Sequence, residues 1–146
     1  MIIPNKAQVL NEFDKLLQLL KATETDDIRY SNVDGLYSTT HYLCTTRVCV
    51  SVAVSIFKDY VAIEKYSEPL CDFRYKSHLE RTQTTPSSIG CEEFVFCTND
   101  NGENCWKSEN MTCTTDELYT HVMKILSALE KSHCDKHPNW SLMQFV

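Results

Sequence analysis

The residues with the clearest capacity for chemistry in this chain are its eight cysteines, all of which lie after residue 43. A structural zinc site would normally contain Cys-x2-Cys or a close variant. The nearest spacings here place four, five or seven residues between cysteines, which matches no strong zinc pattern. An even number of cysteines is typical of a disulfide framework. The disulfide candidates are therefore Cys44, Cys49, Cys71, Cys91, Cys97, Cys105, Cys113 and Cys134.

A second interpretation of the cysteines is that several are small buried apolar side chains with free thiols. The sequence favours a bridge most clearly for Cys97 and Cys105, which flank a polar loop containing Asn101-Gly102. Such a loop predicts a β-hairpin, and a hairpin would bring the two arms close enough for a disulfide.

Other catalytic and metal-binding patterns are weak. His133, Cys134 and His137 could each ligate a metal, but no fourth ligand can be identified. The chain has no nucleophile-elbow motif and only three glycines, too few for a phosphate-cradling loop. Glu92 and Glu93 are adjacent, so on a strand they would point to opposite faces. We therefore predict no metal, no cofactor and no enzymatic activity.

Two N-glycosylation sequons occur, at Asn110 and Asn139. About one or two such motifs would arise by chance in a chain of this composition, so they add little, and it is the cysteines that favour a secreted, disulfide-bonded protein, with these two sites as glycosylation candidates. The first residues, MIIPNKAQ, have neither the charged start nor the apolar segment of a signal peptide. A cytoplasmic protein with reduced cysteines is therefore the alternative.

The expected partner is another protein. A net charge of −6 argues against a nucleic-acid surface, and no apolar run is long enough to insert into a membrane. Aromatic residues beside basic ones are typical of protein–protein contacts, although the same segment could be a solvated loop. The candidate contacts, including two aromatic residues of the apolar C-terminal tail, are Phe73, Arg74, Tyr75, Lys76, Arg81, Trp140 and Phe145.

The elements that would position these residues are two helices and a set of strands. Apolar residues recur with helical spacing in 5–22 and again in about 115–132, where Thr114 and Glu117 can form a capping box. Between them, strict alternation of branched apolar residues over 48–56 indicates a strand, and 60–66 a second strand that completes a hairpin. Further strands are expected at 36–46, 92–97 and 104–109.

This order predicts a single domain, residues 1–146, of the α+β class. We expect an antiparallel sheet of about five strands, with the N-terminal and C-terminal helices packed on one face. A four-helix, cytokine-like bundle is the competing fold. The predicted function is a non-enzymatic protein-binding module, such as a secreted domain in a receptor–ligand interaction. The alternative is an intracellular adaptor or inhibitor that acts through an exposed groove or strand edge. No residues suffice to assign a known family, and the sequence does not predict an oligomeric state.

Overall fold

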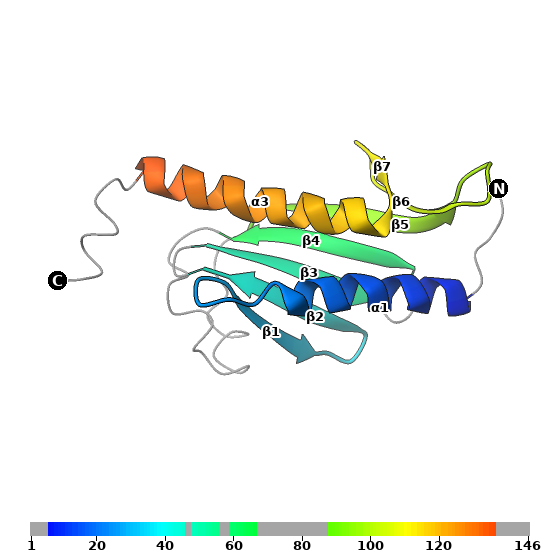
Figure 1. Cartoon of the computed structure of the whole chain (residues 1–146), viewed down its shortest axis with the longest axis horizontal. Helices are drawn as coiled ribbons and strands as arrows, with labels where there is room; N and C mark the ends of the chain where they lie inside the picture. Colours follow the sequence, from blue (N-terminus) through cyan, green and yellow to red (C-terminus); the bar gives the residue numbers. More distant parts are fainter. Residues whose placement is uncertain (1–5, 46–47, 56–58, 67–87, 137–146) are drawn as a thin grey trace.

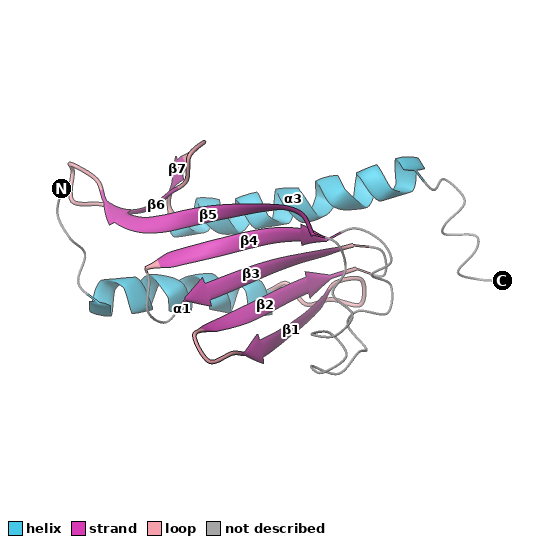
Figure 2. Cartoon of the chain, turned by 180° about the vertical axis from the view of Figure 1, so that it is seen from behind, coloured by secondary structure: helices cyan, strands magenta, loops and turns pink. Residues whose placement is uncertain are grey.

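The computed structural model describes residues 6–45, 48–55, 59–66 and 88–136. In this part of the chain, seven strands form one antiparallel sheet in which each strand pairs with its neighbour in sequence. Helices α1 (Lys6–Ala22) and α3 (Thr115–Lys136) lie beside each other on one face of the sheet (Figures 1 and 2). The strands are β1 (Arg29–Asp34), β2 (Ser38–Cys44), β3 (Cys49–Ser55), β4 (Tyr60–Tyr66), β5 (Ser88–Thr98), β6 (Asn104–Lys107) and β7 (Thr112–Cys113).

The α+β prediction is thus confirmed, with an N-terminal and a C-terminal helix on an antiparallel sheet. The strand count is seven rather than about five, because β1 and β7 were not expected. The four-helix bundle is wrong, since β2, β3 and β4 occupy the segment that it required to be helical. Among the described residues, no helix is both long and apolar enough to cross a membrane.

The core lies between the sheet and the two helices. In β3, Val50, Val52 and Val54 form the row that faces the helices, and Val52 lies opposite Ile63 of β4. The strand predicted from the alternating apolar residues of this segment is therefore confirmed. Each helix contributes one apolar stripe to the same cluster, which comprises Val9, Phe13, Leu16 and Leu20 of α1 and Leu118, Val122, Ile125 and Leu126 of α3.

Two glycines permit turns that other residues would strain. The N–H of Gly35 donates to the carbonyl of Ser38 at 2.7 Å, and a Cβ at this position would lie 2.8 Å from that same oxygen. Gly102, in the β5–β6 turn, has a φ of +80°. Glycine adopts this left-handed conformation without the steric cost that a Cβ imposes. The predicted hairpin around Asn101-Gly102 is confirmed, with Cys97 opposite Cys105.

A buried chain of hydrogen bonds joins both helices to the sheet. The indole Nε1–H of Trp106, on β6, donates to Thr115 Oγ1 at 2.9 Å. The Thr115 hydroxyl in turn donates to the buried carboxylate of Glu12 on α1, which also accepts from Lys15 Nζ at 3.0 Å. Burial alone would raise the pKa of Glu12, but the hydrogen bonds from Thr115 and Lys15 outweigh it and hold the pKa below its usual value.

The start of α3 is fixed by the predicted capping box. The N–H of Glu117 donates to Thr114 Oγ1 at 3.2 Å, and the N–H of Thr114 donates to Glu117 Oε1 at 3.0 Å. These two bonds satisfy donors that the first helical turn leaves unpaired. Asn5 precedes α1 and is of a residue type that caps helices, but it lies outside the described residues.

His41 is a buried polar side chain on the helix-facing side of β2. Its Nδ1 lies 2.6 Å from the hydroxyl of Tyr30, whereas its Nε2 has no hydrogen-bond partner among the described residues. Burial, reinforced by the positive charge of Lys21 and opposed by Asp34, lowers the pKa of His41 to about 4. The imidazole is therefore neutral at physiological pH.

We predict that Thr115→Val destabilises the fold by about 1–3 kcal/mol, because the buried Trp106 N–H loses its acceptor and the buried Glu12 carboxylate loses one of its hydrogen bonds. Chemical denaturation measures this. Thr120→Val is the matched control, because Thr120 is exposed on the same helix. Equal losses in the two variants would contradict a special role for the buried chain.

Stability should also depend on pH through His41. Between pH 6.5 and about 4 the unfolded chain protonates this histidine while the folded chain keeps it neutral. The unfolded state then binds more protons, so stability falls as the pH falls, by roughly 3 kcal/mol across this window. Denaturation at a series of pH values should show a flatter profile for His41→Gln. An unchanged slope in that variant would show that other groups cause the loss.

Candidate functional site

The most distinctive feature of the sheet is that β5 extends well beyond its partner β6. Pairing between the two strands runs only from Thr98 opposite Asn104 to Val95 opposite Lys107. Residues 89–94 of β5 continue alongside β4, and no described strand pairs with their other side. We call this segment, residues 89–94, the open β5 edge.

The backbone direction along the open β5 edge follows from one hydrogen bond. The N–H of Phe96 donates to the carbonyl of Asp59 at 2.8 Å, so Phe96 directs its backbone groups toward the β4 side. Backbone groups alternate in direction along an antiparallel strand. Cys91 and Glu93 therefore direct their N–H and C=O groups away from β4, where the described chain offers no backbone partner.

A pocket of about 820 Å³ lies at this open edge. Three carboxylates and two lysines line it, which gives it a small excess of negative charge. Its lining residues are Lys65, Gly90, Cys91, Glu92, Glu93, Val95, Lys107, Ser108, Glu109 and Asn110. The pocket thus combines charged side chains with the outward backbone groups of Cys91 and Glu93, for which the described strands provide no partner.

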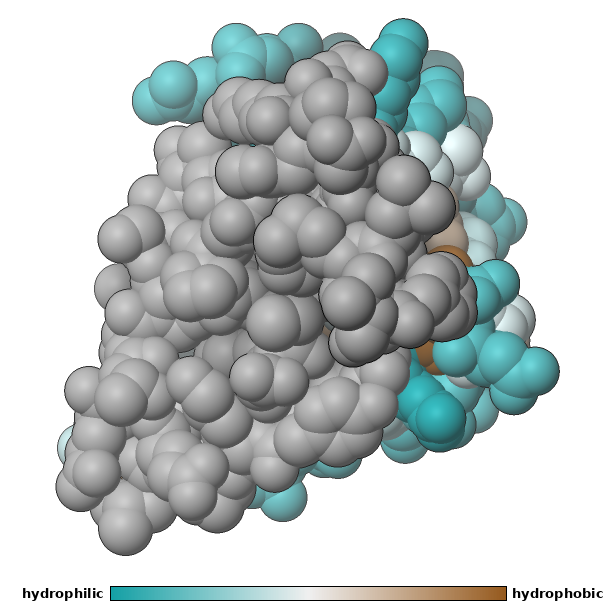
Figure 3. Space-filling view, turned by 90° about the vertical axis from the view of Figure 1, so that its left-hand side faces the viewer, coloured by the Kyte–Doolittle hydropathy of each residue, from teal (hydrophilic) through white to brown (hydrophobic). Residues whose placement is uncertain are grey.

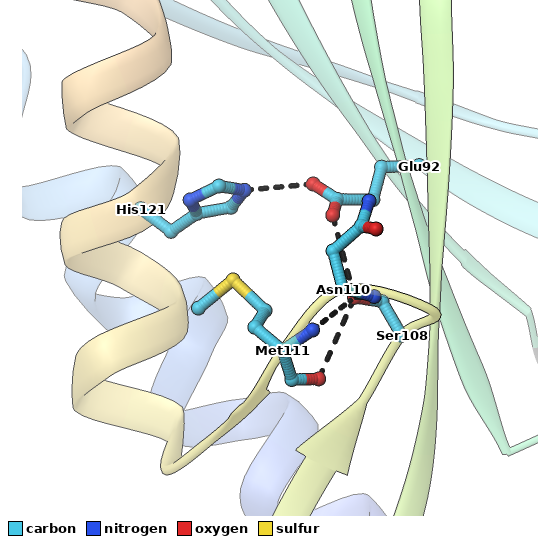
Figure 4. A network of polar contacts seen from close by, with 5 residues as sticks. All are labelled: Glu92, Ser108, Asn110, Met111 and His121. Carbon is cyan, nitrogen blue, oxygen red and sulfur yellow. Dashed lines mark hydrogen bonds and ion pairs between the residues drawn. The ribbon is translucent and has the colours of Figure 1, made fainter.

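One wall of the pocket is held by a polar network between β5, the β6–β7 turn and α3 (Figure 4). Glu92 receives a hydrogen bond from His121 Nε2 of α3 at 2.7 Å and another from the Ser108 hydroxyl at 3.3 Å. Ser108 Oγ accepts from the N–H of Met111 at 3.2 Å and from that of Asn110 at 3.3 Å. The network therefore fixes the turn that borders the open edge.

This network does not have the order of a catalytic triad. In such a triad the histidine lies between the carboxylate and the nucleophile and accepts the hydroxyl proton. Here Glu92 lies in the middle, and both His121 and Ser108 donate to it. The arrangement holds the Ser108 hydroxyl against the Glu92 carboxylate and, within the described part of the chain, places no histidine beside it.

The thiols near the site also lack the features of a nucleophile. Burial, together with the charges of Glu64 and Glu93, raises the pKa of Cys91. Burial raises the pKa of Cys113 to about 11. Reactive cysteines need a lowered pKa, because the thiolate is the attacking species. Among the described residues there is also no cluster of three potential metal ligands.

The opposite edge of the sheet is partly blocked. The N–H of Tyr30, on β1, donates to the carboxylate of Glu24 in the loop that precedes the strand, at 3.0 Å. Charged or capped groups at an edge prevent another chain from pairing with it. The open β5 edge therefore has less protection than the edge formed by β1.

All of the partner contacts predicted from sequence lie outside the described residues. This applies to the basic-aromatic segment from Phe73 to Arg81 and to Trp140 and Phe145. Cys71, Asn139 and the side chain of Cys134 also lie outside them, so these predictions stay predictions. Asn110 is described, and it is exposed at the rim of the β5 pocket.

The residues that build this site were not identified from sequence. Glu92 and Glu93 were correctly expected on opposite faces, since Glu92 contacts α3 while Glu93 is exposed. No pattern, however, connects Glu92 with His121, because 29 residues separate them. The turn of Ser108 to Met111 is the nearest local signal, since serine commonly bonds to backbone groups a few residues ahead.

Figure 3 looks at the end of the molecule where α3 finishes, and the described residues visible there are mostly hydrophilic, with small hydrophobic areas among them. The fold and the site together define an α+β domain with a sequential antiparallel sheet and an open strand edge. Comparison of the chain with protein-family models, curated proteins and solved structures finds no match.

We predict that Ser108→Ala loosens the turn beside the open β5 edge, because the Asn110 and Met111 amides lose their acceptor. One such hydrogen bond contributes about 1 kcal/mol, so amide exchange at these two positions should become several-fold faster. Ser127→Ala, on an exposed position of α3, is the control and should leave both amides unchanged. Unaltered exchange in Ser108→Ala would show that the turn holds itself without the network.

Proposed function

We propose that this protein is a non-enzymatic protein-binding module that accepts an extended segment of another protein along the open β5 edge. The observation that carries the proposal is the pair of outward-directed backbone groups at Cys91 and Glu93 beside an open pocket. An extended peptide can add a strand to such an edge, with main-chain hydrogen bonds providing affinity. The six residues of the open edge span about 20 Å, which accommodates a segment of similar length.

The side chains around the edge support a partner with basic residues. An added strand would place alternate side chains on the outer face, beside Cys91 and Glu93, and the others toward Glu92 and the β6–β7 turn. Glu92, Glu93 and Glu109 outnumber Lys65 and Lys107 in the pocket. The net charge of the chain, −6, acts in the same direction at longer range.

A second copy of this chain is a weaker candidate for the occupant. Pairing of two β5 edges about a two-fold axis would bring the Glu93 carboxylates of both copies onto one face of a short ladder. Like charges on neighbouring positions of paired strands are destabilising. The basic-aromatic residues Phe73, Arg74, Tyr75, Lys76 and Arg81 remain proposed contacts for a protein partner, separate from the basic segment that the β5 edge would accept.

We also propose an extracellular setting, in which the protein is a secreted ligand or receptor domain. Two features of the described residues support this. Cysteines occur in directly opposed cross-strand pairs, and the sequon residue Asn110 is exposed in a turn, as attachment of a glycan requires. An intracellular adaptor with reduced thiols would use the same strand edge.

The binding site is tested by selecting displayed random peptides of about ten residues on the immobilised full-length protein. Peptides that bind should be enriched in Lys and Arg and should protect the amides of Cys91 and Glu93 from hydrogen exchange. Glu93→Pro removes one outward N–H at a position where an edge strand tolerates proline. This variant should bind the selected peptides at least about tenfold more weakly, since a main-chain hydrogen bond is lost and the proline ring blocks the edge.

Asn32→Pro is the matched control, because Asn32 lies on β1 and, by alternation from Tyr30, directs its N–H outward from the other sheet edge. It should bind the peptides like the wild type. Equal affinity in Glu93→Pro, or protection at β1 instead of β5, would overturn the proposal. If the protein dimerises without peptide and the dimer protects the amides of Cys91 and Glu93 from hydrogen exchange, the occupant of the edge is a second copy of the chain and not another protein.

A further inference from the structure

Two pairs of cysteines occupy directly opposed positions on neighbouring strands. Cys44 of β2 lies opposite Cys49 of β3, and their Sγ atoms are 2.6 Å apart. Cys97 of β5 lies opposite Cys105 of β6, with 2.8 Å between the Sγ atoms. In both pairs the two side chains project to the same side of the sheet, as residues opposite each other in a ladder must.

The backbone in both places already suits a disulfide. Residues directly opposite each other on antiparallel strands have Cα atoms about 4.5–5.5 Å apart. Disulfides span Cα separations of about 4.4–6.8 Å. Neither pair therefore needs a movement of the main chain to form a bond, only a small adjustment of the side chains.

The remaining described cysteines are arranged differently. Cys91 lies exposed on β5, and Cys113 is buried on β7 opposite Trp106. Among the described residues, no other sulfur atom lies within hydrogen-bonding distance of the Sγ atom of Cys91 or of Cys113. The close approach of sulfurs is thus specific to the two opposed pairs.

We propose that Cys97–Cys105 and Cys44–Cys49 are two dithiol–disulfide sites, which an external disulfide of the glutathione class oxidises in that order. Each reaction consumes two protein thiols and one external disulfide. A first cysteine thiolate attacks the external disulfide and releases one small thiol. The second cysteine attacks the resulting mixed disulfide, forms the intramolecular S–S bond and releases the second small thiol. The two thiol protons pass to the two departing thiolates.

The order of oxidation follows from access to the sulfurs. Cys97 is partly exposed, whereas Cys105 is buried, so the external disulfide reaches Cys97 first. Burial and the neighbouring Cys97 also raise the pKa of Cys105 to about 12, which makes Cys105 a poor first nucleophile. Cys44 and Cys49 are both fully buried, so oxidation of this pair must wait for local opening of the β2–β3 hairpin.

This inference is independent of the strand-edge site. It also names two particular bridges, whereas the even number of cysteines indicates only that some disulfides could form. The Cys97–Cys105 bond would join β5 to β6 beside the turn that connects them. The Cys44–Cys49 bond would join β2 to β3 in the same way. Both bonds tie neighbours in the sequence, so neither joins distant parts of the chain.

The test begins with the full-length protein, reduced, freed of reductant and mixed with oxidised glutathione. Samples are acid-quenched over time, and the remaining thiols are alkylated. The intact mass before alkylation should fall by about 4 Da in two steps, since each bridge removes two hydrogens. Cleavage after Glu103 separates Cys97 from Cys105 in the sequence, and cleavage after Arg47 separates Cys44 from Cys49. Linked peptides from these digests then identify each bridge, the first step giving Cys97–Cys105.

Cys105→Ala should lose the first step and retain a glutathione adduct on Cys97. Cys113→Ala is the matched control, and both steps should persist in it. Stable glutathione adducts on Cys97, Cys105, Cys44 or Cys49 in the wild type, or bridges from these four to Cys71, Cys91, Cys113 or Cys134, would overturn the proposal. Because the wild-type peptide map decides the pairing, a variant that fails to fold does not affect the result. Absence of the Cys44–Cys49 bridge, even after refolding in the oxidant, would overturn that half.

Discussion

The structure depends on covering one face of a sheet with helices from both ends of the chain. The apolar row of β3 and its neighbours must be buried, and α1 and α3 together are the elements that cover it. The carboxylate of Glu12 lies buried where the two helices meet the sheet, and an unpaired charge there would be costly. Thr115 supplies the required hydrogen bond and is itself tied to Trp106. Sheet, first helix and last helix are consequently positioned relative to one another at a single buried point.

The open β5 edge follows from this arrangement. Because α3 packs across the sheet, His121 lies above β5 and can bond to Glu92. The same carboxylate accepts from Ser108, so the chain turns away from β5 after Lys107 instead of continuing beside it. The β6–β7 turn and the exposed part of β5 are therefore two results of one network. The edge proposed for binding thus lies on the sheet itself and is bordered by a fixed turn, which is where an added strand could pair.

Local patterns in the sequence were sufficient for the elements with a clear period. The alternation around Val50 and Val52, the two helical stripes and the Thr114 capping box each predicted the observed structure, because burial or hydrogen bonding imposes that spacing locally. Strand β1 was missed, since an edge strand with partly exposed residues has no strong alternation and owes its conformation to pairing with β2. The site was missed for a related reason. Contacts such as Glu92 with His121 depend on how β5 passes beneath α3, which no short-range pattern encodes.

The sequential order of the sheet has a consequence for synthesis of the chain. Each strand from β2 to β7 can pair with a neighbour already made, so the sheet can assemble as the chain leaves the ribosome. The helix-facing apolar row, however, is only half covered until α3 emerges, and Thr115 is 103 residues from Glu12. A nascent chain that ends before α3 would therefore expose a hydrophobic surface. Chaperones should engage that surface until the last helix is complete.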